Sequence, residues 1–198
     1  WNDENLLNIA SKVTSDCFIG HVRASTVGDV SLANCHPFTC DEYLFAHNGT
    51  IDNFEAIRKD LLFFLEDDCF HKIKGQTDSE HFFYLIYHIL KKHDESMGLA
   101  IIAALKKLNH ILTKRQLTHN FRINACLTNG KTLSAIRFKS NADQPTLSLY
   151  YSQQHSPKSV IIASERLSEM NEEWLEIPSN HLLTVDEEIN ITLTPIHI

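Results

Sequence analysis

Two short stretches of the sequence carry charged side chains that could hold a small ligand. His21 and Arg23 stand two residues apart in "GHVRAST", so on a strand they would share one face. A guanidinium there could clamp a carboxylate with two hydrogen bonds, although a lone arginine more often pairs with a surface carboxylate. Asp78 stands in "QTDSE", where a carboxylate at a helix start could receive a ligand ammonium group.

The "QTDSE" stretch also has a structural explanation. Thr77 and Glu80 have the spacing of a capping box, in which each side chain binds a free backbone N–H at the helix start. Asp78 would then add a favourable negative charge to the first turn. The structural role and ligand binding can coexist.

An Asn-Gly dipeptide occurs twice. Asn129-Gly130 lies between two strand-like runs, and we expect a hairpin turn there. Asn48-Gly49 follows an apolar run but is followed by "TID" and a helical pattern, with no returning strand. The question is whether this second pair only turns the chain or takes part in chemistry.

Composition excludes several classes of protein. The 198 residues are 43% apolar and 22% charged, which is typical of a globular domain. A net charge of −7 argues against a nucleic-acid partner, and no apolar run is long enough to span a membrane. Five cysteines without a C-x-x-C pair argue against a disulfide framework and favour a cytoplasmic location. Cys35, His36 and Cys40 lie close together but fit no common zinc spacing, so we expect no metal and no cofactor.

Hydrophobic periodicity predicts a helical layer followed by antiparallel strands within one domain, 1–198. Helices are expected at 4–14, at 53–65 with Asp52 as its cap, at 75–92 and at 97–115. Strands are expected at 17–26, 43–47, 121–128, 132–138, 146–152, 158–164, 181–186 and 189–194. The fold class is therefore α+β with mostly antiparallel sheets.

The order of the motifs narrows the function. His-x-Arg-x-x-Thr-x-Gly at 21–28, Asn-x-His-Pro at 34–37, His-Asn-Gly at 47–49 and Thr-Asp-Ser-Glu at 77–80 together resemble the class II glutamine amidotransferases. The stand-alone amidotransferase-like and γ-glutamyl hydrolase types are the most similar. The resemblance implies a four-layer α/β/β/α N-terminal-nucleophile hydrolase sandwich.

The resemblance also implies roles for individual residues. Arg23 would bind the α-carboxylate of glutamine or of a γ-glutamyl compound, and Asp78 its α-ammonium group. The Asn48 side chain and the Gly49 N–H would form the oxyanion hole. Six further residues would lie behind these groups, namely His21, Thr26, Gly28, His36, His47 and Thr77.

The catalytic group of the family is an N-terminal cysteine, whereas residue 1 here is Trp1. One explanation is that the nucleophile and the first strands precede the given sequence, and we favour it. The other is a catalytically inactive relative that binds γ-glutamyl ligands or acts as a scaffold. Cys35, beside His36, is the internal cysteine to examine. We expect a glutaminase-type amidohydrolase with a cysteinyl acyl-enzyme, as a homo-oligomer or with a separate ammonia-accepting partner.

Overall fold

A computed structural model describes residues 4–22, 31–167 and 173–198 of the chain. Its helices are α1 (Glu4–Ala10), the 3-10 turn η1 (Leu32–Asn34), α2 (Phe54–Phe64), α3 (Asp67–Phe70), α4 (Asp78–His93) and α5 (Met97–Lys114). Its strands are β1 (Phe38–Cys40), β2 (Tyr43–Ile51), β3 (Phe121–Thr128), β4 (Leu133–Lys139), β5 (Tyr150–His155), β6 (Lys158–Ala163), β7 (Leu175–Glu176), β8 (His181–Val185) and β9 (Ile191–Pro195).

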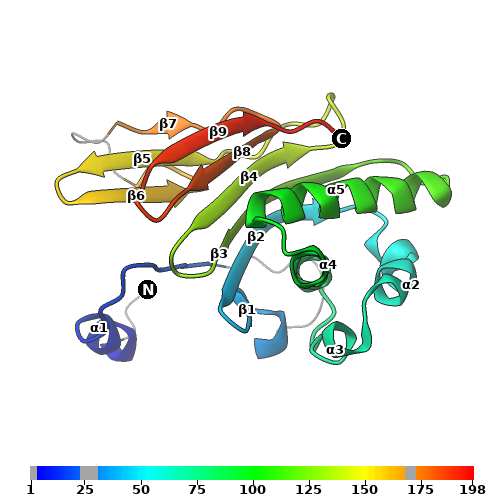
Figure 1. The fold of residues 1–198 in the computed structure, drawn as a ribbon, viewed down its shortest axis with the longest axis horizontal. Helices are drawn as coiled ribbons and strands as arrows, with labels where there is room; N and C mark the ends of the chain where they lie inside the picture. The colour runs from blue at the N-terminus through cyan, green and yellow to red at the C-terminus, as the bar shows by residue number, and fades with distance from the viewer. Residues whose placement is uncertain (1–3, 23–30, 168–172) are drawn as a thin grey trace.

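The large sheet has six strands in the order β1-β2-β3-β4-β8-β9, and every neighbouring pair is antiparallel. One face of this sheet is covered by α2–α5, as Figure 1 shows. Phe45, Ile123 and Ile136 lie on this face and are fully buried in the main hydrophobic core. Alternation of apolar residues along β2 and β3 therefore fixes which face meets the helices.

Helices α4 and α5 start where the sequence supplies caps. The side chains of Thr77 and Ser96 accept hydrogen bonds from the N–H groups of Glu80 and Leu99, respectively. Nearly the whole of α4 up to Leu90 is buried, because β2, α2 and α5 all pack around it. The start of α4 is thus held rigidly beside β2, which matters for the site described below.

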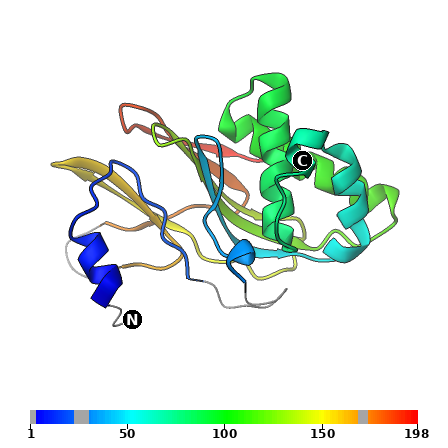
Figure 2. The same ribbon diagram turned by 90° about the horizontal axis from the view of Figure 1, so that it is seen from below.

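A smaller sheet, in the order β6-β5-β7, lies over the other face of the large sheet (Figure 1). A separate core, containing Leu149, Ile177, Leu183 and Val185, fills the space between the two sheets. The predicted fold is therefore confirmed as a layered α/β sandwich with antiparallel sheets. Figures 1 and 2 both show α1 well apart from α2–α5, so in the described part of the chain the covering helices lie on one side.

Most predicted elements are confirmed within a few residues, but three expectations were wrong. Residues 17–22 of the expected strand 17–26 form no strand, and Phe18 and Val22 are each 67% exposed, so no apolar face is buried there. Strand β5 begins at Tyr150 rather than 146, because the carbonyls of Leu147 and Ser148 accept bonds from Arg137 and Asn124 side chains. The rest of the strand 17–26 lies outside the described residues.

The third error concerns the end of β2 and the start of α2. Strand β2 continues to Ile51, so Asn48 and Gly49 lie inside a strand paired with β3. The cap of α2 is Asn53, in the left-handed conformation, rather than Asp52. The Asp52 carboxylate instead accepts a bond from the Asn120 side chain. This bond joins the end of β2 to the segment that leads into β3.

Candidate active site

Strand β2 directs the side chains of its successive residues to two different faces. His47 and Ile51 point to the helices and are 3% and 2% exposed, respectively. Asn48 points to the opposite face and is exposed. Its side chain forms no hydrogen bond with any residue in the described ranges. The amide of Asn48 is therefore available to a ligand on the face that α4 does not cover.

Gly49 is required by its surroundings. Its φ is +153°, and a Cβ there would lie 2.0 Å from the carbonyl oxygen of Arg122 and 2.7 Å from Nε2 of His47. Any side chain would displace β3 or the His47 ring. The glycine lets β2, β3 and the imidazole meet at one point.

The pairing pattern shows where the N–H of Gly49 points. The N–H of Asp52 donates to the carbonyl of Asn120, on the β3 side, whereas that of Ile51 donates to the Asp78 carboxylate at 2.9 Å. Because successive N–H groups of a strand point to opposite sides, Gly49 shares the direction of Ile51. β1 pairs with β2 only as far as Phe45, so Gly49 directs its N–H to the edge that β1 leaves uncovered.

Asp78 is placed at this same edge by the first turn of α4. Its carboxylate accepts hydrogen bonds from the N–H of Ile51 and from the N–H of Ser79 at 2.8 Å. The Ser79 hydroxyl lies 3.3 Å from the same carboxylate. A carboxylate offers about four acceptor positions, so an ammonium group could still bind to this side chain, which is 7% exposed.

His47 lies under the glycine and contacts the same turn of α4. Its Nδ1 is 2.8 Å from Oγ of Ser79. Nε2 makes no hydrogen bond of ordinary geometry in the described residues. Burial lowers the pKa of His47, while the charge of Asp78 and the nearby Arg122 backbone partly oppose that shift. The imidazole is therefore neutral at physiological pH.

The loop before β1 is docked on the start of α4. The N–H of Gln76 donates to Oδ1 of Asn34 at 3.0 Å. Thr77 caps the helix as expected, but the expected capping box was half wrong. The Glu80 carboxylate accepts bonds from the N–H groups of Lys74 and Gly75, at 2.8 and 2.7 Å, instead of reaching back to Thr77. Glu80 thereby fixes the loop that carries Thr77 and Asp78.

Two further predicted histidines lie near this edge. The rings of His21 and His36 are 4.2 Å apart between centroids, and His36 contacts Phe38 at 4.6 Å. His21 is also close enough to His47 to lower its pKa slightly. The structure thus gathers seven predicted residues at β2 and the start of α4: His21, His36, His47, Asn48, Gly49, Thr77 and Asp78. Arg23, Thr26 and Gly28 lie outside the described residues.

Sequence reasoning missed Ser79, the N–H of Ile51 and the anchoring role of Asn34. The residue type of Ser79 gave no signal, because serine is common in the first turn of a helix. The contact of Ile51 with Asp78 depends on how far β2 extends. Asn34 belonged to the motif at 34–37. Its bond to Gln76 could be recognised only once the two loops were seen together.

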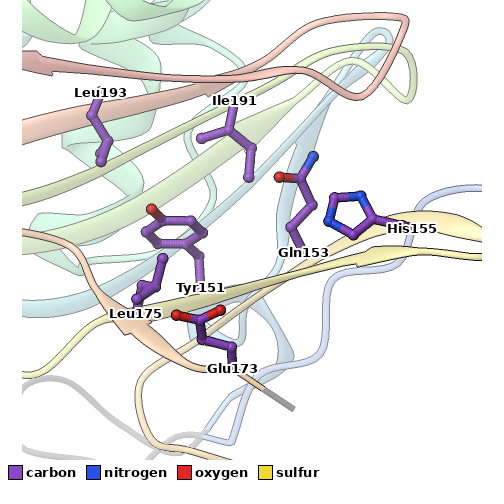
Figure 3. A pocket seen from close by; sticks show the side chains of 7 residues that line it. All are labelled: Tyr151, Gln153, His155, Glu173, Leu175, Ile191 and Leu193. Carbon is purple, nitrogen blue, oxygen red and sulfur yellow. The ribbon is translucent and has the colours of Figure 1, made fainter.

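Two hollows lie elsewhere on the molecule. One, of about 300 Å³, opens between the two sheets and contains none of the predicted site residues (Figure 3). Tyr151 and Leu175 from the small sheet face Ile191 and Leu193 from β9 there. The other, of about 330 Å³, touches Leu44 and Thr128. Leu44 shares its face of β2 with Asn48, roughly 13 Å away along the strand.

The internal cysteines have free thiols. Cys35 is exposed and its thiol donates to the carbonyl of Ser31 within its own loop. Cys126 lies opposite Ala46 and shares the face of Asn48, but burial raises its pKa to about 12. A thiol that stays protonated is a poor nucleophile. Within the described residues, no helix is long and apolar enough to cross a membrane.

Comparison with known proteins identifies the protein family. Residues 5–195 match the family described as class-II glutamine amidotransferases, and the chain belongs to this family. The chain is 32% identical, over 229 aligned residues, to the Saccharomyces cerevisiae protein named Probable glutamine amidotransferase DUG3. That alignment covers 99% of this chain and 64% of the yeast protein. The chain thus spans less than two thirds of that relative.

Solved structures agree on the fold. The glutamine aminotransferase class-II domain protein SPO2029 from Silicibacter pomeroyi superposes with a TM-score of 0.82 at 30% identity, covering 99% of this chain and 81% of that one. The glutamine phosphoribosylpyrophosphate amidotransferase from B. subtilis gives a TM-score of 0.60 at 15% identity, over 90% of this chain and 34% of that one. The latter similarity concerns the fold alone. The N-terminal-nucleophile hydrolase fold expected from the motifs is confirmed.

Proposed function

We propose that the protein hydrolyses the γ-amide of glutamine or of a γ-glutamyl compound, with Asn48 and Gly49 as its oxyanion hole. One observation carries the proposal. Asn48 and Gly49 lie inside a strand, where a turn is not needed, and no described residue bonds to the Asn48 amide. The alternating direction of N–H groups along β2 points the Gly49 N–H to the edge where Asp78 lies.

Two side chains bind the α-amino and α-carboxylate groups of the substrate. Asp78 holds the α-ammonium group through its remaining acceptor positions. Arg23 binds the α-carboxylate with its two-pronged guanidinium. The chain belongs to a family named for its use of glutamine, which supports this assignment. The substrate is thus held by its head while its amide reaches Asn48.

The reaction proceeds in two steps through a cysteine nucleophile. The thiolate sulfur bonds to the γ-carbonyl carbon, and the carbonyl oxygen takes negative charge that Asn48 and Gly49 stabilise. The carbon–nitrogen bond then breaks, and the leaving ammonia or amine takes a proton. Water attacks the thioester, releases glutamate and restores the thiol.

The experiment is glutamine hydrolysis by the full-length protein, with ammonia and glutamate measured in the same assay. We expect Asn48→Ala to lower kcat by roughly 10²- to 10³-fold. Asp78→Asn should mainly raise KM, because it removes the charge that holds the ammonium group. Cys126→Ser, on the same face as Asn48, is the control that keeps activity. Wild-type activity in both Asn48→Ala and Asp78→Asn would refute the assigned roles.

The alternative of a binder without hydrolysis makes a different prediction. Such a protein would bind glutamine or a γ-glutamyl amide through Arg23 and Asp78 but would form no adduct with a glutamine-like electrophile. Mass spectrometry of the labelled full-length protein identifies the modified cysteine and decides between the two functions. The free thiols at all five cysteine positions also support a reducing compartment, and we propose a cytoplasmic location.

A further inference from the structure

Two contacts tie β2 to the start of α4, one on each side of Gly49. His47 is bonded to the Ser79 hydroxyl at 2.8 Å, and Ile51 donates its N–H to the Asp78 carboxylate at 2.9 Å. The Ser79 hydroxyl lies 3.3 Å from that carboxylate, so the two contacts are joined. We call His47, Ile51, Asp78 and Ser79 the β2–α4 clamp.

The clamp spans the segment that carries the oxyanion hole. His47 and Ile51 are four residues apart, which is roughly 13 Å along a strand. Asn48 and Gly49 lie between them. β1 stops pairing at Phe45, so the clamp replaces a neighbouring strand on this edge. The position of the Gly49 N–H therefore depends on side chains of α4.

All four members are buried, so water does not compete with these contacts. His47, Asp78 and Ser79 are 3%, 7% and 7% exposed, and Ile51 is 2% exposed. Phe45 and Phe82 also pack near the His47 ring, at 6.5 Å between centroids. Gly49 leaves the space that the ring occupies, since a Cβ there would lie 2.7 Å from Nε2. The His47 ring is thus confined to one position.

We infer that His47 and Ser79 are positioning residues, which hold the Gly49 N–H at a fixed place relative to the Asp78 carboxylate. This inference rests on the proposed function, because it assigns the two ends of one substrate to those two groups. The substrate ammonium and the attacked amide are separated by a fixed length of aliphatic chain. An error of about 1 Å between their binding groups can cost roughly 100-fold in rate.

The test compares two serines near the starts of two helices, one that contacts the His47 ring and one that caps its own helix. Ser79→Ala removes the His47 contact of the clamp and leaves the bond from Ile51 to Asp78. Ser96→Ala removes the cap of α5, where Ser96 accepts the N–H of Leu99 at 3.4 Å. We expect Ser79→Ala to lower kcat roughly 10- to 100-fold while KM changes less than about threefold. Ser96→Ala should leave both constants unchanged. Ser79→Thr, which keeps the hydroxyl, should recover most of the lost kcat.

Hydrogen exchange of residues 47–51 provides a measurement that needs no activity. We expect exchange to be at least about 10-fold faster in Ser79→Ala than in the wild type, and unchanged in Ser96→Ala. Unchanged exchange at 47–51 in Ser79→Ala would overturn the inference. So would faster exchange with a normal kcat, because the contact would then be only structural. A wild type without amidase activity refutes the proposed function instead, and the exchange ratio still decides whether the clamp holds the segment.

Discussion

The two Asn-Gly pairs of this chain have the same sequence and opposite structural roles. Asn129-Gly130 joins β3 to β4 in a hairpin, as expected. The Asn129 Oδ1 accepts bonds from the N–H of Lys131 at 3.1 Å, and from the N–H and hydroxyl of Thr132 at 2.9 and 3.2 Å. Gly130 has φ +84°, and a Cβ there would meet nothing within 4 Å. This pair uses its polar groups to close its own turn.

Asn48-Gly49 makes none of these local bonds. The strand carries the pair straight through, and its conformation is set by β3, His47 and α4 rather than by the dipeptide. The Asn48 amide is left for something outside the described fold. The two pairs therefore differ in what sets their conformation: local bonds at Asn129-Gly130, and neighbouring elements at Asn48-Gly49.

Replacing each glycine by alanine should give the largest difference in stability between the two Asn-Gly pairs. In Gly49→Ala the new Cβ would lie 2.0 Å from the Arg122 carbonyl, so we expect the free energy of unfolding to fall by at least about 3 kcal/mol. Gly130→Ala meets no neighbour and should cost about 1 kcal/mol, from its positive φ alone. Urea unfolding followed by circular dichroism measures both. Equal losses would show that Gly49 is not tightly enclosed.

Replacing each asparagine by alanine should give opposite results in a stability assay and an activity assay. Asn129→Ala loses three accepted bonds, so we expect a stability loss of about 1–2 kcal/mol with normal activity per folded molecule. Asn48→Ala loses no bond within the described residues and should keep its stability within about 0.5 kcal/mol, while kcat falls roughly 10²- to 10³-fold. The comparison fails if Asn48→Ala unfolds as easily as Asn129→Ala does.

Acid should weaken the region around β2 and α4 through a buried histidine. Burial lowers the pKa of His81 from 6.5 to about 4, and Arg58 donates to its Nε2 at 3.2 Å. The unfolded chain therefore takes up a proton below pH 6.5 that the folded chain refuses until about pH 4, and stability falls across that range. Between pH 7.5 and 5.5 we expect His81 to account for a loss of about 1 kcal/mol.

The measurement is the free energy of unfolding at both pH values for the wild type and His81→Gln. The variant should be less stable at pH 7.5, because it disturbs the bond to the Thr77 carbonyl, but its loss on acidification should be smaller. His47 contributes with the same sign in both proteins, since burial also lowers its pKa. An identical pH dependence in the two proteins would exclude His81 as a source of acid sensitivity.

The sequence predicted helices and strands correctly where the spacing of apolar residues repeats over several turns. The buried faces of α4 and α5 each recur over several helical turns, and Thr77 marked a helix start correctly. The prediction of where β2 ends was wrong, because Asn48 and Gly49 have low strand propensity. The residues that keep them extended belong to β3 and α4. Over its described residues, 17–22, the expected strand 17–26 is absent for the opposite reason: Phe18 and Val22 are apolar but are each 67% exposed.

The candidate site was predictable as a set of residue types but not as an arrangement. Asp78 and Asn48 came from ordered motifs that resemble a family. That Asp78 would also bind the N–H of Ile51 depends on a strand edge that β1 leaves open. Ser79 joins two groups 31 residues apart, Asp78 and His47, and no local pattern encodes such a contact.

The Asp78 carboxylate has a consequence for association between chains. A strand edge with unpaired N–H groups can recruit a strand from another molecule, and among the described residues no strand pairs with this edge of β2 beyond Phe45. Asp78 accepts the N–H of Ile51 and offers no donor in return, so an incoming strand finds a negative charge in place of a pairing partner. The side chain that we propose to hold the substrate ammonium would thus also keep the strand of another molecule from pairing with this edge of β2.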